Sequence, residues 1–142
     1  MADFNDRYSR LAIHPLHAVL LAFPLPLFLS ALVADMAYRS TYLIQWLNFA
    51  QWLIAGALLM GAFVLVWALV ELVRSRELRT VWHMIYFLSL LAMWILGFIN
   101  ALEHAKDAYA TMPGGMWLSL IVTLLALVAT WVGYSGLREE VR

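Results

Sequence analysis

Cysteine is absent from the 142-residue sequence, and charged residues are scarce, at 13% of the chain. Without cysteine the chain cannot form disulfides, thiolate zinc sites, iron–sulfur clusters or the thioether attachment of c-type haem. Nine basic and nine acidic residues balance to zero net charge, which excludes the basic surface that a nucleic-acid-binding protein needs. Hydrophobic residues make up 65% of the chain, against about 45–50% in soluble domains. The composition therefore predicts an integral membrane protein in contact with the lipid bilayer.

The few charged residues divide the sequence into four long stretches without charge, at residues 11–34, 40–70, 80–102 and 108–137. About 20 residues of helix cross the hydrocarbon core of a bilayer, so each stretch predicts one transmembrane helix. We expect an all-α fold: a single transmembrane domain over residues 1–142, built as an up-down-up-down four-helix bundle. The predicted helices span about 11–38, 43–73, 80–105 and 113–137. Pro24 and Pro26 are expected to bend the first of them.

Basic residues are unevenly distributed between the two ends of this predicted bundle. Seven arginines fall on the side of the two termini, whereas only Arg39 and Lys106 fall on the other side. Because basic loops stay in the cytoplasm, the pattern predicts a multi-pass protein of the bacterial inner membrane with both termini cytoplasmic. The first stretch has no clear cleavage site before Asp35, so we interpret it as a retained helix rather than a signal peptide.

His17 and His83 are predicted to lie at nearly the same depth on the first and third helices, which run in the same direction. Each lies in the first turn of its helix, where the helix dipole disfavours imidazolium, and neutral imidazole is the form that binds metals. Facing histidines in a four-helix bundle suit a b-type haem, whose iron takes one axial nitrogen from each side. We therefore expect haem b between these helices near the cytoplasmic side, with His14 as a substitute ligand or a neighbour of the site.

Two arginines are placed to complete such a site. Arg10 and Arg79 lie one or two turns outside the histidines, where they would pair with the haem propionates. Alternatively, His14, His17 and His83 would together hold a bare zinc, copper or iron ion without porphyrin.

Asp35 and His104 are secondary candidates on the predicted outer side of the membrane. Ionisable residues inside a bilayer are costly, which makes them functional candidates. His104 ends the third helix, where the dipole favours a protonated imidazole, so we expect a cation there rather than a metal ligand. For Asp35, an ion pair with Arg39 or Lys106 is the favoured interpretation.

Polar amides recur near the outer end of the second helix. Gln45, Asn48 and Gln51 are spaced three residues apart, and Asn100 is expected at a similar depth. These four side chains would line a cavity for a quinone head group. Hydrogen bonding between helices also explains them and is the favoured interpretation.

The string from Ile13 to His17, IHPLH, is followed by Pro24, Pro26 and Asp35, and a basic stretch leads from Arg74 to His83. This pattern resembles an uncharacterised family of bacterial membrane proteins, the domain of unknown function 2231. The resemblance implies four transmembrane helices over nearly the whole chain. Members of the family occur fused to Rieske-type or c-type cytochrome modules, so the resemblance also implies electron-transfer partners and haem.

These features predict a membrane-embedded b-type haem protein that carries electrons rather than an enzyme that transforms a substrate. A Rieske-type protein, a cytochrome c or a quinol would be its redox partner. Two alternatives stay open: an accessory subunit of a larger membrane complex without a cofactor, and a histidine-based protein that binds or transports metal ions. Pairs of small residues four apart also permit a homo-oligomer, although packing within the bundle is the favoured explanation.

Overall fold

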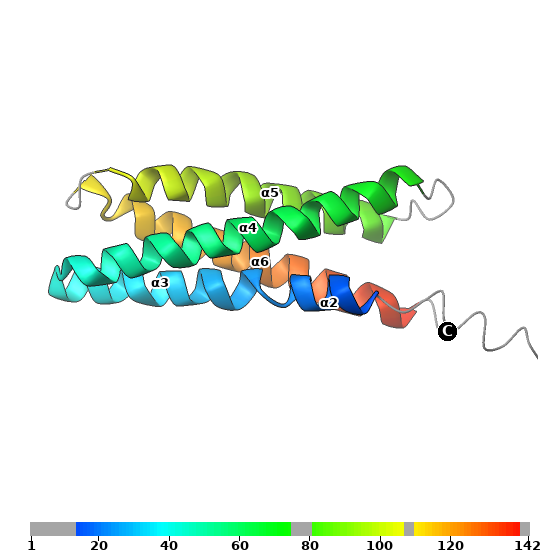
Figure 1. Ribbon diagram of the computed structural model, residues 1–142, viewed down its shortest axis with the longest axis horizontal. Coiled ribbons are helices and arrows are strands. Elements are labelled where there is room, and N and C mark those ends of the chain that lie inside the picture. The colour runs from blue at the N-terminus through cyan, green and yellow to red at the C-terminus, as the bar shows by residue number, and fades with distance from the viewer. Residues whose placement is uncertain (1–13, 75–80, 107–109, 140–142) are drawn as a thin grey trace, which may run out of the picture.

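The computed structural model describes residues 14–74, 81–106 and 110–139 of the chain. Its helices are α2 (Pro15–Leu21), α3 (Pro24–Thr41), α4 (Ile44–Arg74), α5 (Val81–His104) and α6 (Gly114–Glu139) (Figure 1). The described residues contain no strand, which confirms the predicted all-α fold.

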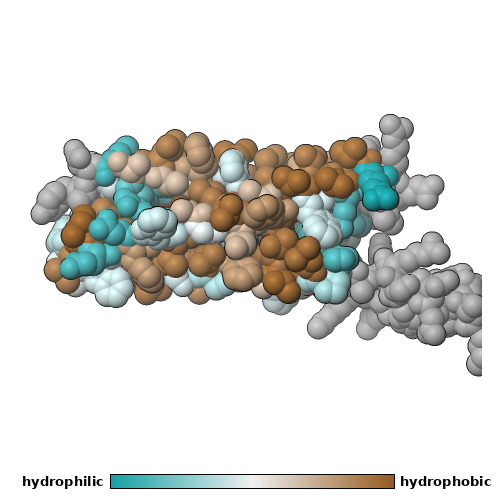
Figure 2. Space-filling view, viewed as in Figure 1, coloured by the Kyte–Doolittle hydropathy of each residue, from teal (hydrophilic) through white to brown (hydrophobic). Residues whose placement is uncertain are grey.

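Four segments of the described chain are long and apolar enough to cross a membrane, with lengths of 27, 31, 24 and 22 residues. The first of them combines α2 and α3, and the others correspond to α4, α5 and the larger part of α6. Hydrophobic residues dominate the middle of the face in Figure 2, and hydrophilic residues gather toward its two ends. This distribution matches a bundle whose middle faces lipid and whose ends face the head groups and water.

The four spans form an antiparallel bundle (Figure 1). α3 packs against α4 and α6, and α5 packs against the same two helices. α3 and α5 therefore lie on one diagonal of the bundle, and α4 and α6 lie on the other. A side chain that joins α3 or α2 to α5 has to cross the core.

The first span is interrupted at its prolines, as the sequence predicts. α2 ends at Leu21 and α3 begins at Pro24, because a proline nitrogen cannot donate to the helix ladder. A neighbouring helix contributes a hydrogen bond close to the break: the Tyr134 hydroxyl on α6 donates to the Ala18 carbonyl over 2.6 Å. Such help from adjacent helices is what permits an interrupted helix within a membrane.

The helix ends agree with the predicted ends to within a few residues, and the largest differences are in the first span. That span begins at Pro15 rather than residue 11, because the His14 side chain caps α2 by accepting from the Leu16 N–H over 3.3 Å. It ends at Thr41 rather than residue 38, where Tyr42 takes a left-handed conformation with φ of 54°. The predicted helical residues 11–13 lie outside the described residues.

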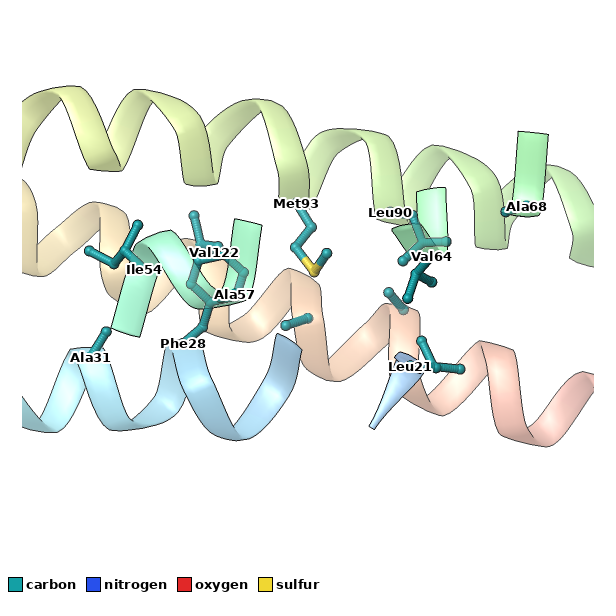
Figure 3. Packing of buried hydrophobic residues seen from close by; sticks show 12 residues of the cluster. Leu21, Phe28, Ala31, Ile54, Ala57, Val64, Ala68, Leu90, Met93 and Val122 are labelled. Carbon is teal, nitrogen blue, oxygen red and sulfur yellow. The ribbon is translucent and has the colours of Figure 1, made fainter. Parts of the chain in front are cut away.

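The middle of the bundle is filled by apolar side chains from every span (Figure 3). Phe28, Ile54, Val64, Leu90 and Val122 are all fully buried in one hydrophobic cluster. This apolar core separates two groups of polar side chains that lie at opposite ends of the bundle.

Candidate functional site

The first polar group, the Asp–His cluster, consists of Asp35 on α3, Asn100 and His104 on α5, and Ser119 on α6. All four residues are completely buried, with 0% of their surface exposed. His104 Nε2 lies 2.8 Å from Asp35 Oδ1, so the pair spans the diagonal of the bundle. A buried charged residue is rarely found without a partner, and here each member supplies one to the other.

Hydrogen bonds from α5 and α6 complete this cluster. The Asn100 side-chain amide donates to Ser119 Oγ over 2.9 Å, and the Ser119 hydroxyl donates to Asp35 Oδ2 over 2.5 Å. On the other side, His104 Nδ1 is 2.9 Å from the Asn100 backbone carbonyl. Both Asp35 oxygens and both His104 nitrogens therefore have hydrogen-bond partners.

These contacts limit where the protons of the Asp–His cluster can lie. A carbonyl only accepts, so Nδ1 of His104 carries a proton. The 2.8 Å contact then has two forms: an imidazolium that donates to a carboxylate, or a protonated Asp35 that donates to a neutral imidazole. Ser119 donates to Oδ2 in both forms. One proton can thus move between His104 and Asp35 while every other hydrogen bond is retained.

Local structure at the start of α6 leaves room for the imidazole. A Cβ atom on Gly115 would lie 2.8 Å from His104 Cε1 and 2.8 Å from Thr111 Cγ2, so only glycine fits at this position. The His104 backbone carbonyl, in the last turn of α5, accepts a hydrogen bond from the Gln51 side chain on α4. Each of the four spans therefore contributes to the position of His104 or its partners.

The charged side chains around the Asp–His cluster are engaged elsewhere. Lys106 pairs with Glu103 over 2.6 Å, and Arg39 donates to the Met116 sulfur over 3.7 Å. The interpretation of Asp35 as a partner of Arg39 or Lys106 is therefore wrong. Those residues are close to Asp35 or His104 in sequence, but α3 and α5 direct Asp35 and His104 inward.

The second polar group, the His–Tyr cluster, lies at the other end of the bundle and consists of His14, His17, Trp67 and Tyr86. His17 Nε2 is 2.9 Å from the Tyr86 hydroxyl, which joins α2 to α5 across the core. The Trp67 ring on α4 lies 5.2 Å from the His14 ring and 5.4 Å from the His17 ring, measured between centroids. The Trp67 N–H donates to Glu71 over 2.7 Å.

Among the described residues, two side-chain polar atoms are buried without a hydrogen-bond partner, one in each cluster. They are His17 Nδ1 and Asn100 Oδ1. Such atoms are uncommon because a buried polar group without a partner is destabilising. His17 is 4% exposed, so bulk water does not reach its ring directly.

The predicted haem ligands hold the positions in their helices that the sequence indicates, since His17 and His83 are each the third residue of α2 and α5. The residue that reaches His17, however, is Tyr86, one turn beyond His83. Tyr86 also packs against α6, where a Cβ on Gly133 would lie 2.8 Å from its ring and 2.6 Å from Leu21. Protein side chains thus fill this part of the core, and the residues as placed do not fit a haem at His17.

The other predicted ligands are not gathered into a metal site. Among the described residues, no group of three or more histidine, aspartate or glutamate side chains could hold a metal ion, so His14, His17 and His83 do not form one. Arg10 and Arg79, the predicted propionate partners, lie outside the described residues.

The four amides are divided between the surface and the core. Gln45 and Asn48 are exposed, whereas Gln51 and Asn100 make hydrogen bonds within and beside the Asp–His cluster. Hydrogen bonding between helices, the favoured interpretation, is therefore correct for two of the four. They do not jointly line a cavity for a quinone head group.

Comparison with known proteins addresses the family of the chain. Residues 13–137 match the sequence family described as "Predicted membrane protein (DUF2231)". The chain belongs to this family. The match extends over all residues of the Asp–His cluster and the His–Tyr cluster, and it confirms the resemblance found in the first helix. No curated protein and no solved structure matches the chain.

Three residues of the two clusters were missed by reasoning from the sequence: Ser119, Trp67 and Tyr86. Ser119 belongs, with Thr123, to the pairs of small residues four apart that the sequence analysis explains by helix packing, although it lies in the second turn of a helix that starts at the end where Asp35 and His104 lie. Comparing the depths of polar residues on all four spans would have found it. Tryptophan and tyrosine are common in apolar helices, and nothing in the spacing of Trp67 and Tyr86 distinguishes them from core residues.

Proposed function

We propose that the protein binds and releases a proton in the membrane at the buried Asp35–His104 pair. The observation that carries this proposal is the 2.8 Å contact between His104 Nε2 and Asp35 Oδ1, with both residues fully buried. Ionisable residues inside a membrane bundle mark proton and ion sites more often than they serve stability. A buried ion pair is also no better for stability than apolar residues of similar volume.

The surroundings of the pair suit a single exchangeable proton. With one proton between them, in addition to the one on His104 Nδ1, the two residues have no net charge, which is the state that the apolar interior favours. The titratable groups nearest in sequence are Tyr38 and Arg39 on α3, and Glu103 beside His104. Lys106 is paired with Glu103 and the Arg39 guanidinium points to Met116, so neither cation neutralises Asp35 in place of His104.

The proposed proton exchange takes place at one side of the membrane. The proton is not proposed to cross the membrane through a single copy of the chain. Most buried side chains between the two clusters are apolar, among them Phe28, Val64, Leu90 and Val122. Asp35 is six residues before the end of α3, which is roughly 9 Å along a helix. The pair therefore lies close to the end of the bundle, within reach of that interface.

This function describes a proton-exchanging subunit rather than an enzyme. The bias of basic residues toward both termini supports a bacterial inner membrane protein with the Asp–His cluster on the outer side. A redox partner such as a Rieske-type protein or a cytochrome c, implied by the family's fusions, would use a proton acceptor at that position.

Nitrogen NMR of histidine-labelled protein in nanodiscs tests the proposal, with His104→Gln to assign the signal. We expect the Nε2 resonance of His104 to move with pH while Nδ1 stays protonated. The movement should be lost in Asp35→Asn. A His104 signal that stays constant at every pH at which the bundle stays folded would mean that the pair is only a structural clamp.

Haem b electron transfer is a second proposal. The observation in its favour is the buried His17 ring with its free Nδ1, and the placement of Tyr86 on Nε2 speaks against it. A reduced-minus-oxidised absorption spectrum of the purified protein decides the matter. Sharp b-type bands that are lost in His17→Ala would establish haem. A colourless protein containing stoichiometric zinc or copper would favour the metal-ion function, and one without metal an accessory subunit.

A further inference from the structure

We infer, on the basis of the proposed proton exchange, that Asn100 is the positioning residue for the proton shared by Asp35 and His104. Asn100 contacts both members of the pair. Its backbone bonds to His104, and its side chain reaches Asp35 through the hydroxyl of Ser119. The side-chain contact decides how the shared proton is divided between the two residues.

The backbone of Asn100 fixes the proton on one nitrogen of the imidazole. The Asn100 carbonyl lies 2.9 Å from His104 Nδ1, and a carbonyl only accepts, so the Nδ1 proton stays at this contact. Nε2 is then the nitrogen that shares a proton with Asp35, over 2.8 Å. This part of the arrangement does not depend on the Asn100 side chain and is retained when that side chain is replaced.

The side chain of Asn100 sets the direction of the Ser119 hydroxyl. Its amide nitrogen donates to Ser119 Oγ over 2.9 Å. A hydroxyl has one hydrogen, and that hydrogen is directed away from the incoming N–H and toward Asp35 Oδ2, over 2.5 Å. A hydrogen bond donated to the carboxylate stabilises its charged form, so the arrangement favours the shared proton on His104.

A buried atom without a partner shows which hydrogen bond this arrangement favours. Asn100 Oδ1 has no hydrogen-bond partner, although the residue is 0% exposed. Turning the amide over would present Oδ1 to Ser119 and give it a donor, but the hydroxyl would then turn away from Asp35. The observed orientation leaves the neutral oxygen without a donor and keeps one on the carboxylate, because a charged group costs more to leave unpaired.

Removing the Asn100 amide should therefore move the shared proton toward Asp35. Without the amide, the Ser119 hydroxyl is free to bond to a carbonyl of its own helix, as serine hydroxyls in helices do. Asp35 then loses its donor for part of the time and holds the proton more strongly. The loss of one ordinary hydrogen bond corresponds to a change of about threefold to tenfold in how the proton is divided.

Two signals measured together on the full chain in nanodiscs test this inference. They are the protonated Nε2 resonance of His104 in nitrogen NMR and the carboxylic-acid C=O band of Asp35 in the infrared. A proton that moves from His104 to Asp35 weakens the first signal and strengthens the second, whereas a proton lost to solvent strengthens neither. We expect opposite changes of the two signals in Asn100→Val, with the proton ratio shifted about threefold to tenfold toward Asp35.

Three further variants show whether Asn100 acts through Ser119. Asn100→Ala, which only removes atoms, should give the same pattern as Asn100→Val, and so should Ser119→Ala. Because Ser119→Ala already removes the hydroxyl, the double variant Asn100→Ala with Ser119→Ala should shift the proton no further than Ser119→Ala alone.

Thr123→Val is the matched control. Thr123 is buried one turn beyond Ser119 on the same helix, and its hydroxyl donates to the Ser119 backbone carbonyl over 2.6 Å. The variant therefore loses a buried hydroxyl close to the Asp–His cluster and leaves the Ser119 side chain intact. We expect the two signals to stay as in wild type, whatever the change in stability.

Three results would overturn the inference. Lower stability with both signals unchanged in Asn100→Ala and Asn100→Val would make Asn100 a structural residue only. Additive shifts in the double variant would mean that Asn100 does not act through Ser119. A shift in Thr123→Val as large as in Asn100→Ala would show that any loss of a polar group nearby moves the proton.

The proposed proton exchange is tested separately, by the response of the wild-type signals to pH. If these signals respond to pH but not to the Asn100 variants, the positioning role is wrong and the exchange is retained. If they stay constant with pH and respond to the Asn100 variants, the positioning role is retained and the exchange is wrong.

Discussion

His104 Nε2 lies 2.8 Å from Asp35 Oδ1, and this contact joins the two diagonal helices α3 and α5 through the interior of the bundle. Neighbouring helices in a membrane are held together mainly by close packing and small residues. Helices on a diagonal are too far apart for that, so long or polar side chains have to connect them. The contact between His17 and Tyr86 does the same at the other end.

Loss of one member of the Asp35–His104 pair should be strongly destabilising. We expect Asp35→Ala and His104→Ala each to lower the free energy of unfolding by about 3–5 kcal/mol, because each leaves a buried polar group without its partner. The double variant should lose less than the sum of the two, with a coupling of about 0.5–3 kcal/mol. SDS-induced unfolding in detergent micelles measures all three. Arg39→Ala, at an exposed position nearby, is the control and should change stability by no more than about 0.5 kcal/mol. Strictly additive losses would show that the two residues do not interact.

Gly115 should tolerate no larger residue. Gly115→Ala would place a methyl group 2.8 Å from His104 and 2.8 Å from Thr111, and such overpacking costs about 1–3 kcal/mol. Gly56→Ala is the matched control, because its Cβ would meet only Leu27 at an ordinary 3.7 Å. Alanine is the better helix former, so that variant should be neutral or more stable by up to about 1 kcal/mol. If the two variants unfold alike, the close approach of α6 to His104 is not present in the membrane.

Tyr86→Phe should destabilise the other end of the bundle. The change removes the hydroxyl that contacts His17 Nε2 and leaves both nitrogens of a buried imidazole without partners, at a cost of about 1–3 kcal/mol. The same change in a His17→Phe background should be nearly neutral, because the polar partner is already gone. An equal loss in both backgrounds, measured by the same SDS titration, would contradict the contact.

The four spans could be predicted from the sequence because charge is excluded from the bilayer core and each gap in charge is long enough to cross it. The break at Pro24 was equally predictable, since proline always removes a donor. The cap at His14 could also have been predicted from the residues around it. These features depend on residues that are close together in the chain.

The two clusters could not be predicted because they depend on how the helices are rotated about their axes. Asp35 and His104 are 69 residues apart, and only packing across a diagonal brings them together. The depth argument paired His17 with His83, and each is the third residue of its helix. It could not show that Tyr86, one turn beyond His83, lies on the face of α5 that is turned toward His17. Tyr86 is half-buried in the core.

The central claim, a titratable proton on Asp35 and His104, is tested most directly by infrared difference spectroscopy of the protein in nanodiscs as pH is stepped. We predict a carboxylic-acid C=O band that changes with pH, is absent in Asp35→Asn and persists in Glu103→Gln. In Ser119→Ala the band should move to higher frequency, because Oδ2 loses the hydroxyl that donates to it. The absence of any Asp35-dependent band at every pH at which the bundle stays folded would contradict the claim.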